Sequence, residues 1–366
     1  MFHQPHVHHL RRTDCRVDRR AGPADGVRHA NRCRDGRPPQ SRAPVLRYRP
    51  LESRSARAGD AGAGSRLAHP GQCIAVDDTL FRRSGRHVYG AVWAYDGSRS
   101  VAKGQSKLSK GTTFVVAAVV VELPFADRPI ALPVLFRLWR PGGPTKTLLA
   151  RDLIYRIAAA RPDRRVHVVA AGAYVCSTLR HLPANVTLTG PLPRNAALYE
   201  VHPDVDNPPN MRGRRGRPRT RGAKIGTPAD LAAATAGEPV TVTRYGRTTT
   251  VTVHERRCLW YGAFRSQPVR VLVVREPRRP GLALLTTDTT APAAEVVERY
   301  AARWSIEVAF FEAKHVTGAG EARNRTRPAV ERTVPFGMLT QTLVILWYHL
   351  AGHSPAVVAE RRRRAR

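Results

Sequence analysis

An uninterrupted apolar run, FVVAAVVV from Phe114 to Val121, constrains the fold of this chain most strongly. The run is rich in β-branched side chains and shows no alternation of polar and apolar residues. Such a strand must be covered on both of its faces, because neither face carries groups that water solvates well. The run therefore predicts a sheet with helices on both sides, which is an α/β architecture.

The segments around this run fit the same architecture. The stretch 73–81 predicts a short apolar strand that ends in the carboxylates Asp77 and Asp78. A second strand is predicted within 86–98, and another buried strand within 164–174. Between them, 145–162 has the pattern of an amphipathic helix that ends at Pro162. Residues 71–182 thus predict the first part of a mixed sheet with flanking helices.

The character of the chain changes at about residue 183. From 183 to 290 the sequence predicts mainly β segments around a basic loop, which indicates a β-rich insertion. A helix from about Ala291 to Lys314 is expected to return to the first fold. A last apolar helix follows, so residues 291–352 are assigned to the core and 353–366 to a basic, solvated tail.

Residues 1–70 differ from everything that follows. They are rich in Arg, Pro, Gly, Ala and His, lack lysine, and show no helical or strand period. Composition of this kind predicts disorder. Two interpretations stay open: a DNA-binding arm, or the product of a GC-rich gene translated out of frame.

Charge and cysteine content restrict the partners and the compartment. The chain carries 61 Lys+Arg against 28 Asp+Glu, a net charge of +33. This excess favours a polyanion, most simply nucleic acid, although a genome biased towards arginine codons would also produce it. The five cysteines form no CxxC pair, so neither a zinc site nor a disulfide framework is predicted, and a reducing cytoplasm is expected.

No membrane association is expected from the sequence. The start of the chain lacks the apolar core of a secretory signal. The apolar stretch 336–352 is interrupted by Thr340, Gln341, Thr342 and His349. It therefore predicts a core helix better than a membrane span.

Four polar residues interrupt the apolar surface of the helix predicted around residue 307. On a helical wheel, Tyr300, Arg303, Glu307 and Lys314 fall within roughly 60° of one another. Apolar residues fill much of the remaining circumference: Trp304, Ile306, Val308, Phe310 and Phe311. A polar stripe on a helix of this kind faces a partner charge, a metal or a polar ligand. The plainest alternative is a structural ion pair between Glu307 and the two cations.

Carboxylates from separate elements suggest which of these applies. Asp77 and Asp78 are expected at a strand end, where sites gather in open α/β sheets, although an Asp-capped turn explains them equally well. Together with Glu307 they would form a cluster that holds one or two Mg²⁺ ions. Two such ions activate a water or hydroxyl and stabilise the leaving oxygen in phosphodiester cleavage.

The spacing of the stripe is similar to a known signature. Tyr300, two residues, Arg303, three residues, Glu307, six residues, Lys314 resembles the Y-R-E-K motif of insertion-sequence transposases of the DDE superfamily. The segment AVDDT resembles the family's first acidic motif, and its register favours Asp77 over Asp78. The resemblance extends over about residues 72–350. It implies an RNase H-like core with a β-rich insertion between the second and third acidic positions.

The resemblance also implies roles for the acidic residues. Asp77 and Glu307 would ligate the catalytic Mg²⁺ or Mn²⁺ ions. The second aspartate is expected directly after the strand 165–170, where this chain has Ala171; Asp288 is a weak alternative. A methyl group cannot ligate a metal. The resemblance therefore implies a defective copy of a bacterial DNA transposase, or, as the alternative, a non-catalytic DNA-binding protein derived from one.

The same resemblance implies DNA as the partner. Tyr300, Arg303 and Lys314 would position the element ends and target DNA near the cut, and a homodimer is expected in the DNA complex. A nuclease on the same fold that cuts without strand transfer is a further alternative.

A short basic loop, RRGRPR at 214–219, adds a second candidate contact. Arg215, Arg217 and Arg219 would enter a narrow A·T-rich minor groove. The alternative is a flexible loop that makes unspecific phosphate contacts.

Overall fold

A computed structural model describes residues 71–102, 104–203, 220–277 and 279–352. The predictions for the N-terminal 70 residues, for the basic tail and for Arg215, Arg217 and Arg219 lie outside this part of the chain.

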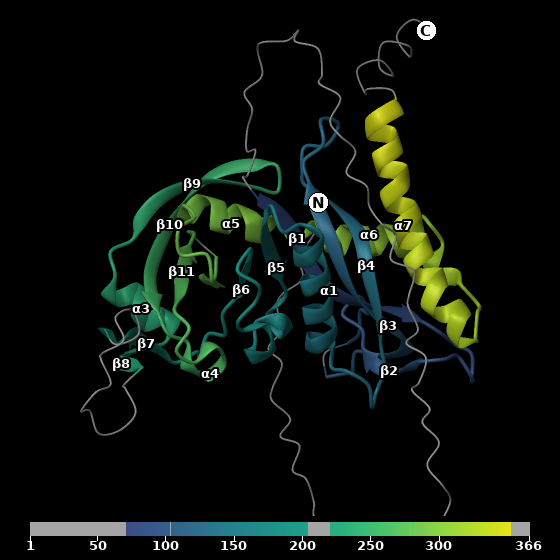
Figure 1. Cartoon of the computed structure of the whole chain (residues 1–366), viewed down its shortest axis with the longest axis horizontal. Helices are drawn as coiled ribbons and strands as arrows, with labels where there is room; N and C mark the ends of the chain where they lie inside the picture. Colours follow the sequence, from purple (N-terminus) through teal and green to yellow (C-terminus); the bar gives the residue numbers. More distant parts are fainter. Residues whose placement is uncertain (1–70, 103, 204–219, 278, 353–366) are drawn as a thin grey trace, which may run out of the picture. The chain divides into compact units, whose positions relative to one another are not determined.

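A ten-stranded mixed sheet forms the centre of the described structure (Figure 1). Its strand order is β2-β3-β1-β5-β6-β12-β11-β10-β9, and β4 pairs with the free side of β3. The strands are β1 (Gly71–Arg82), β2 (Val92–Tyr95), β3 (Leu108–Val121), β4 (Ile130–Trp139), β5 (Arg165–Ala170), β6 (Val186–Pro191), β9 (Glu238–Arg244), β10 (Arg247–Cys258), β11 (Val269–Arg275) and β12 (Leu282–Thr286).

Five of these strands establish the fold class. β4, β3 and β1 are antiparallel neighbours, and β5 and β6 then continue the sheet parallel to β1. Three antiparallel strands followed by two that run parallel to the first is the RNase H-like arrangement. The prediction of an RNase H-like mixed sheet is therefore confirmed. Strand β3 contains the apolar run, of which Phe114 to Ala118 are buried, whereas Val119 to Val121 are only partly buried.

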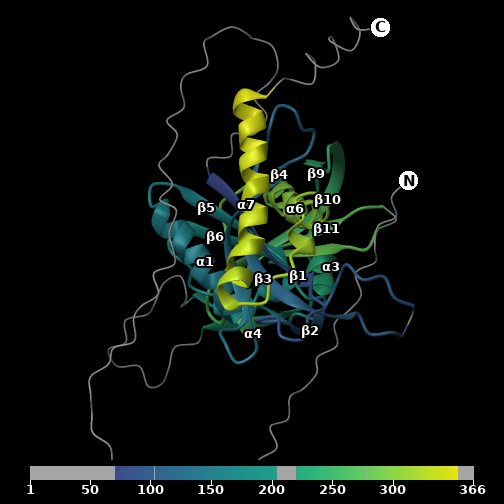
Figure 2. The ribbon, with the colours of Figure 1, turned by 90° about the vertical axis from the view of Figure 1, so that its right-hand side faces the viewer.

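Helices cover both faces of the sheet. They are α1 (Lys146–Ala160), α3 (Pro228–Ala234), α4 (Tyr261–Phe264), α5 (Ala293–Ala302), α6 (Ser305–His315) and α7 (Arg327–Ala351), with single 3₁₀ turns at Gly172–Tyr174, Ser177–Leu179 and Ala319–Glu321. The amphipathic helix predicted at 145–162 is α1, whose N-cap Thr145 accepts a hydrogen bond from the Leu148 amide. Figure 2 shows α1 and α6 on opposite sides of the central strands.

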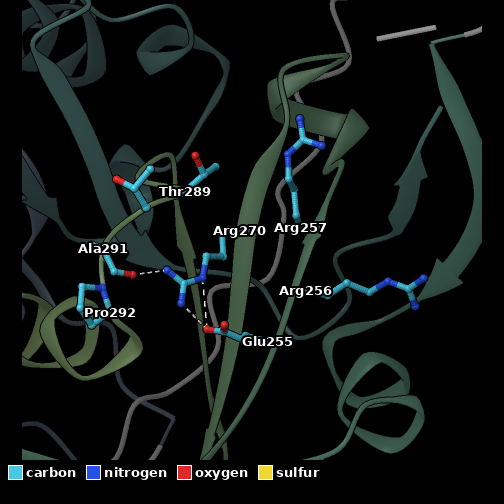
Figure 3. A pocket seen from close by; sticks show the side chains of 8 residues that line it. Glu255, Arg256, Arg257, Arg270, Thr289, Ala291 and Pro292 are labelled. Carbon is cyan, nitrogen blue, oxygen red and sulfur yellow. Dashed lines mark hydrogen bonds and ion pairs between the residues drawn. The ribbon is translucent and has the colours of Figure 1, made fainter. Parts of the chain in front are cut away.

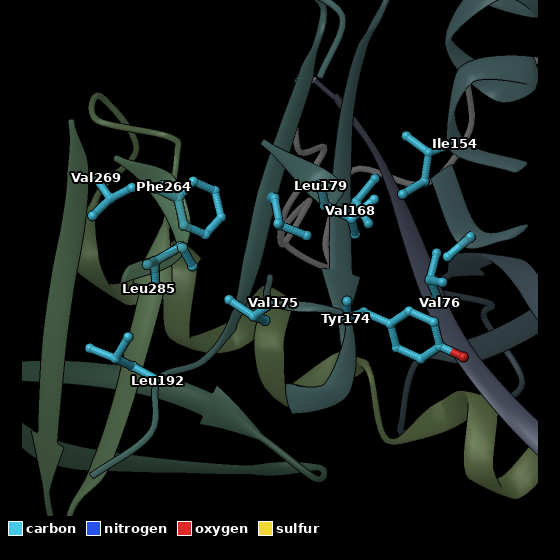
Figure 4. Packing of buried hydrophobic residues seen from close by; sticks show 14 of the residues in the cluster. Val76, Ile154, Val168, Tyr174, Val175, Leu179, Leu192, Phe264, Val269 and Leu285 are labelled. Atoms are coloured by element: carbon cyan, nitrogen blue, oxygen red, sulfur yellow. The ribbon is translucent and has the colours of Figure 1, made fainter. Parts of the chain in front are cut away.

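Two hydrophobic layers follow from this arrangement. The larger one lies under α1 and includes Val76, Ile154, Val168 and Tyr174 (Figure 4). On the opposite face α6 packs Phe310 and Ile306 against β1, β3 and β5, and α5 covers β9–β12. Residues alternate between the faces along each strand, so each strand contributes to both layers.

Most strands of the region from 183 to 290 belong to the same sheet as the first part of the chain. β6 pairs with β5, and β12 pairs with β6, so that β12, β11, β10 and β9 extend the core sheet itself. A small second sheet joins β7 (Leu198–Val201) to β8 (Arg221–Gly226). Backbone hydrogen bonds therefore continue across the boundary between core and insertion that the sequence predicted at residue 183.

Strand β4 was absent from the sequence predictions. Its segment contains Pro133, which argues against a central strand. The structure places Pro133 opposite Ala118, at the irregularity in the β3–β4 register. The missing amide is therefore accommodated at a bulge, where the regular ladder is interrupted.

The helix predicted from about Ala291 to Lys314 is two helices. The break lies at Arg303 and Trp304, between α5 and α6. The expectation of burial around most of its circumference was also wrong. Trp304, Val308 and Phe311 are exposed, because α6 lies on the sheet with one face only.

The expectation of a buried last helix was wrong as well. α7 stands beside β4 (Figure 1) and buries only a narrow set of residues that includes Val334 and Met338. Large apolar side chains on its other side are exposed: Phe336, Leu343, Val344, Trp347 and Leu350. Among the described helices, α7 is the one long and apolar enough to cross a membrane, which is weak evidence by itself.

Candidate functional site

The position of Asp77 follows from the different lengths of two strand pairings. β1 is paired with β5 only as far as Val76, opposite Ala170. On its other side β1 stays paired with β3 through Arg82. The sequence predicted that this strand ends at the two aspartates. That prediction was wrong, because the strand continues beyond them. Asp77 instead lies inside β1, one residue beyond the last pair that β1 forms with β5.

Arg303 joins Asp77 to Glu307. One guanidinium nitrogen of Arg303, Nη1, lies 3.0 Å from Asp77 Oδ2, and the other, Nη2, lies 2.9 Å from Glu307 Oε1. The side chain of Arg303 is only 13% exposed. The break between α5 and α6 places Arg303 directly above β1, whereas Glu307 follows one turn later in α6. The structure thus brings together three of the predicted site residues.

Asp77 is poorly compensated at this position. Burial is the largest influence and raises the pKa of Asp77 to about 7; the neighbouring carboxylates Asp78 and Glu307 act in the same direction. Arg303 and the Asp78 amide, 2.8 Å from Asp77 Oδ1, act against this and do not offset it. A buried carboxylate with too few partners is typical of a site that receives another ligand.

Asp78 has a different environment. It points to the α1 face, where its Oδ2 lies 2.6 Å from Lys146 Nζ and its Oδ1 accepts a hydrogen bond from the Tyr174 hydroxyl at 2.7 Å. Burial and the adjacent Asp78 raise the pKa of Tyr174, so this hydroxyl stays protonated. Asp78 is therefore saturated by its own partners, which supports the choice of Asp77. The sequence contained no signal for the contact with Lys146.

Tyr300 lies next to the three-residue cluster, and Lys314 does not. The Arg303 guanidinium carbon is 5.7 Å from the centre of the Tyr300 ring. Burial is the main reason that the pKa of Tyr300 is raised. Lys314 instead places its ammonium 5.5 Å from the centre of the Phe81 ring, two turns further along α6. The predicted polar stripe is therefore divided within α6, because Glu307 in its first turn contacts Arg303, whereas Lys314 near its end lies over Phe81.

Ala171 occupies the place expected for the second acid. It directly follows Ala170, the last β5 residue that is paired with β1, whose partner is Val76, the residue before Asp77. Ala171 is partly buried and contacts the core under α1. It contributes no ligand atom.

Asp288, the alternative to Ala171, belongs to another cluster. Its Oδ2 lies 2.8 Å from Arg299 Nη1, and its Oδ1 accepts hydrogen bonds from the amides of Thr290 and Ala291 and from the Thr290 hydroxyl. Although burial alone would raise its pKa, these hydrogen bonds lower the pKa of Asp288 to about 2. It has no described contact with Asp77. The suggestion that it replaces the second acid gains no support.

A regular charge spacing could have revealed this second cluster. Glu295, Arg299, Arg303 and Glu307 follow one another at intervals of four residues. Glu295 binds Arg299 and Glu307 binds Arg303, so each end of the series forms an ion pair between a carboxylate and an arginine. The polar stripe predicted from the sequence included only the second pair, Arg303 and Glu307.

The residues at this site do not complete a divalent-metal centre. Within the described residues, no three His, Cys, Asp or Glu side chains are arranged to hold a metal ion. Only Asp77 and Glu307 converge, and a guanidinium lies between them. Hard divalent cations prefer several oxygen ligands, so these two carboxylates leave the site short of ligands. We derive no metal-dependent step for this chain as it stands.

Comparisons with known proteins identify the family. Among curated proteins, none matches the chain. Among solved structures, a cryo-EM structure of a piggyBac transposase synaptic complex with hairpin DNA aligns with a TM-score of 0.37 and 9% identity, covering 75% of this chain and 48% of that chain. This chain thus spans about half the length of that transposase. The family model for DDE superfamily endonucleases matches residues 61–267, more than half of the chain, a span that includes Asp77 and Ala171. The chain belongs to the DDE superfamily endonucleases.

Proposed function

We propose that this chain is a DNA transposase of a bacterial insertion sequence whose phosphodiester cleavage is impaired. Membership of the endonuclease superfamily supplies the reaction class. One observation supports the rest: Ala171 directly follows β5, where the resemblance expects the second acid, and Ala170 before it pairs with Val76, the residue before Asp77. Asp77 and Glu307 are the remaining acidic residues for a Mg²⁺ or Mn²⁺ ion.

DNA is the substrate that the net charge of the chain supports. Arg303 contacts both carboxylates and stacks near Tyr300, so this pair can meet a phosphate oxygen and a base at the same place. The excess of 33 positive charges adds unspecific attraction to the backbone. We expect Lys314 to contact DNA separately from these two, since its described neighbour is Phe81.

A second candidate is a DNA-binding protein without catalysis, either domesticated or a repressor of active copies. The position of Arg303 favours it, because the guanidinium already contacts both of the carboxylates that a metal would need. Under this alternative the same surface binds DNA, and metal ions have no effect on it.

The test compares three versions of the full chain: wild type, Ala171→Asp and Ala171→Asn. Asparagine is the matched control, because it has the size of aspartate without its charge. Two quantities are measured for each, Mn²⁺ binding by calorimetry and Mg²⁺- or Mn²⁺-dependent nicking of DNA that carries the element ends. Arg303 stays in place in all three, so the result isolates the missing carboxylate.

We expect Ala171→Asp alone to bind Mn²⁺ measurably and to nick DNA. If the wild type already nicks as well as Ala171→Asp, the second acid lies elsewhere and the proposed defect does not exist. If Ala171→Asp neither binds Mn²⁺ nor nicks, while all three chains bind DNA equally, the non-catalytic alternative is favoured.

A further inference from the structure

Tyrosine and arginine side chains alternate in a short row where β7, β8 and α4 meet (Figure 1). The guanidinium carbon of Arg221 lies 4.5 Å from the centre of the Tyr199 ring and 5.3 Å from the centre of the Tyr261 ring. The guanidinium carbon of Arg265 lies 5.4 Å from the centre of the same Tyr261 ring. Tyr261 thus contacts both arginines, and these four residues are called the tyrosine–arginine row.

The elements that carry the row are held together by the fold. Tyr199 and Leu259 exchange two backbone hydrogen bonds, of 3.0 and 2.7 Å, which fix β7 to the end of β10. α4 begins two residues later and is anchored by Phe264, which is fully buried in the layer under α1. Arg221 and Arg265 nevertheless stay exposed. The rings therefore orient two exposed guanidinium groups in advance, which lowers the entropy lost when a ligand binds them.

The backbone of Arg265 is in a conformation that favours glycine. Its φ is 56° and its ψ is −124°. The Gln267 amide donates to the Phe264 carbonyl at 3.1 Å, which closes a type II′ turn with Arg265 at the second position. A side chain at this position strains the backbone by more than an exposed cation–π contact stabilises it. The contact with the ring therefore does not offset the strain, and such strained positions are concentrated at functional sites.

Other arginines of the β-rich region already have acidic partners. Arg270 is bound by Glu255, as Figure 3 shows. Arg256 lies 2.7 Å from Glu200. Within the described part of the chain, the two arginines of the row have no carboxylate partner, and a guanidinium group keeps its charge at any ordinary pH. The row is therefore a positive surface that an anion can approach.

The surrounding chain indicates which anion this is. β7 and β8 precede and follow the basic loop 214–219, for which the sequence predicted contacts with DNA, and Arg221 comes two residues after that loop. Guanidinium groups bind phosphate oxygens through paired hydrogen bonds, and tyrosine hydroxyls donate to the same oxygens. The row therefore fits the phosphate backbone of DNA.

The row and the acidic cluster belong to opposite faces of the sheet. Phe264 anchors α4 in the layer under α1. Asp77 is on the same side of β1 as Ala75, which packs beneath α6 on the other face. A phosphate at the row is consequently not the one that Arg303 meets beside Asp77.

We propose that the tyrosine–arginine row is a second DNA-binding surface, which holds the phosphate backbone of a duplex without reading its sequence. The inference rests on the proposed function for its ligand, DNA. Arg221 and Arg265 contact phosphate oxygens, and the two tyrosines position them. Because the row is on the other face, DNA bound at the acidic cluster leaves it free for a second duplex segment.

The test compares Arg221→Ala and Arg265→Gly with the control Arg275→Ala. Arg275 is an exposed arginine at the far end of β11, the strand that follows the Arg265 turn, so its variant loses the same charge away from the row. Affinity of the full chain for a short DNA duplex is measured by fluorescence anisotropy at several salt concentrations. The melting temperature of each variant is the check on folding.

We expect each row variant to weaken binding roughly fivefold and to reduce the slope of log K against log salt by about 0.9, the value for one phosphate contact. Arg265→Gly should at the same time keep or raise the melting temperature, because glycine adopts this turn without strain. Arg275→Ala should leave affinity and slope within experimental error. Row variants that bind DNA as the wild type does would overturn the proposal, and so would an equal loss in Arg275→Ala, since net charge alone would then explain it.

A second arm separates DNA from other anions and from failure of the proposed function. Polyglutamate that displaces the labelled duplex as effectively as unlabelled DNA would overturn the proposal in favour of an acidic protein. If the wild type binds no DNA, the proposed function is wrong, and inorganic phosphate is then titrated while the melting temperature is followed. A phosphate-induced rise that Arg265→Gly lacks would retain the row as an anion site, and equal behaviour of the two chains would remove it.

Discussion

Two acidic clusters lie one helical turn apart, and they differ in how completely their charges are satisfied. In the first, Arg299 binds Asp288 and Glu295; in the second, Arg303 binds Asp77 and Glu307. Asp288 also accepts three hydrogen bonds from its own loop, and its pKa is lowered to about 2. Burial raises the pKa of Asp77 to about 7.

We infer from this difference that the first cluster is structural and that the second belongs to the proposed site. Both arginines belong to the same helical segment and have the same kinds of partner. A saturated cluster stabilises the loop before α5 and needs nothing further. An incompletely compensated carboxylate costs stability, and such costs are concentrated at functional sites.

Removing the arginine should affect the two clusters unequally. Arg299→Met leaves Asp288 buried without its cation, so the free energy of unfolding should fall by about 3–5 kcal/mol. Arg303→Met should cost only about 1 kcal/mol at pH 7, because Asp77 takes up a proton at little cost when its pKa is near 7. Urea denaturation measures both.

The exposed pair Arg156–Asp152 in α1 supplies the control. Arg156→Met should change the unfolding free energy by less than about 0.5 kcal/mol. Equal costs for Arg299→Met and Arg303→Met would show that the two clusters are both structural.

Asp77 should make the protein less stable as the pH rises. Between pH 4 and 7 the unfolded chain has lost the proton of Asp77 while the folded chain still holds it, so stability falls with increasing pH. A pKa of about 7 against an ordinary 3.8 corresponds to at most about 4 kcal/mol, and partial exposure reduces this figure.

Asp77→Asn should remove this pH dependence. The measurement is the unfolding free energy of wild type and variant at several pH values from 4 to 8. The difference between the chains should grow in favour of the variant as the pH rises. A constant difference across this range would mean that Asp77 is already ionised at pH 4, and the contrast with Asp288 would disappear.

Asp288 should have the opposite effect at lower pH. Its folded pKa of about 2 is below its ordinary value, so the stability that it contributes is present above about pH 4 and is lost as the pH falls towards 2. The corresponding loss is about 2 kcal/mol. In Asp288→Asn this acid-dependent part should be missing, which acid titration followed by circular dichroism can check.

Tyr300 should contribute the smallest effect. Tyr300→Phe keeps the ring near Arg303 and removes the hydroxyl, so stability should change by about 0.5 kcal/mol or less. If Tyr300 contacts DNA by stacking, Phe should retain the affinity and Leu should lose it, because only an aromatic ring stacks on a base. Equal affinity for all three side chains would exclude stacking.

The sequence predicted the parts that depend on local spacing. The apolar run at 114–121 indicated a strand buried on both faces, and in the structure it lies within β3, between β1 and β4, with Phe114 to Ala118 buried. The interval of four residues between Arg303 and Glu307 predicted their contact, since helical neighbours meet at this spacing. The second acid was expected directly after β5, and this expectation depended only on the order of the strands along the chain.

Tertiary structure decided the rest, because the deciding contacts join residues far apart in the chain. Packing on one face of the sheet exposed Phe311 and the outer side of α7, which their apolar composition had suggested would be buried. Lys146 neutralised Asp78 from α1, so only Asp77 was left undercompensated. Periodicity in a sequence determines which face a side chain occupies, but only the folded chain determines what lies opposite that face.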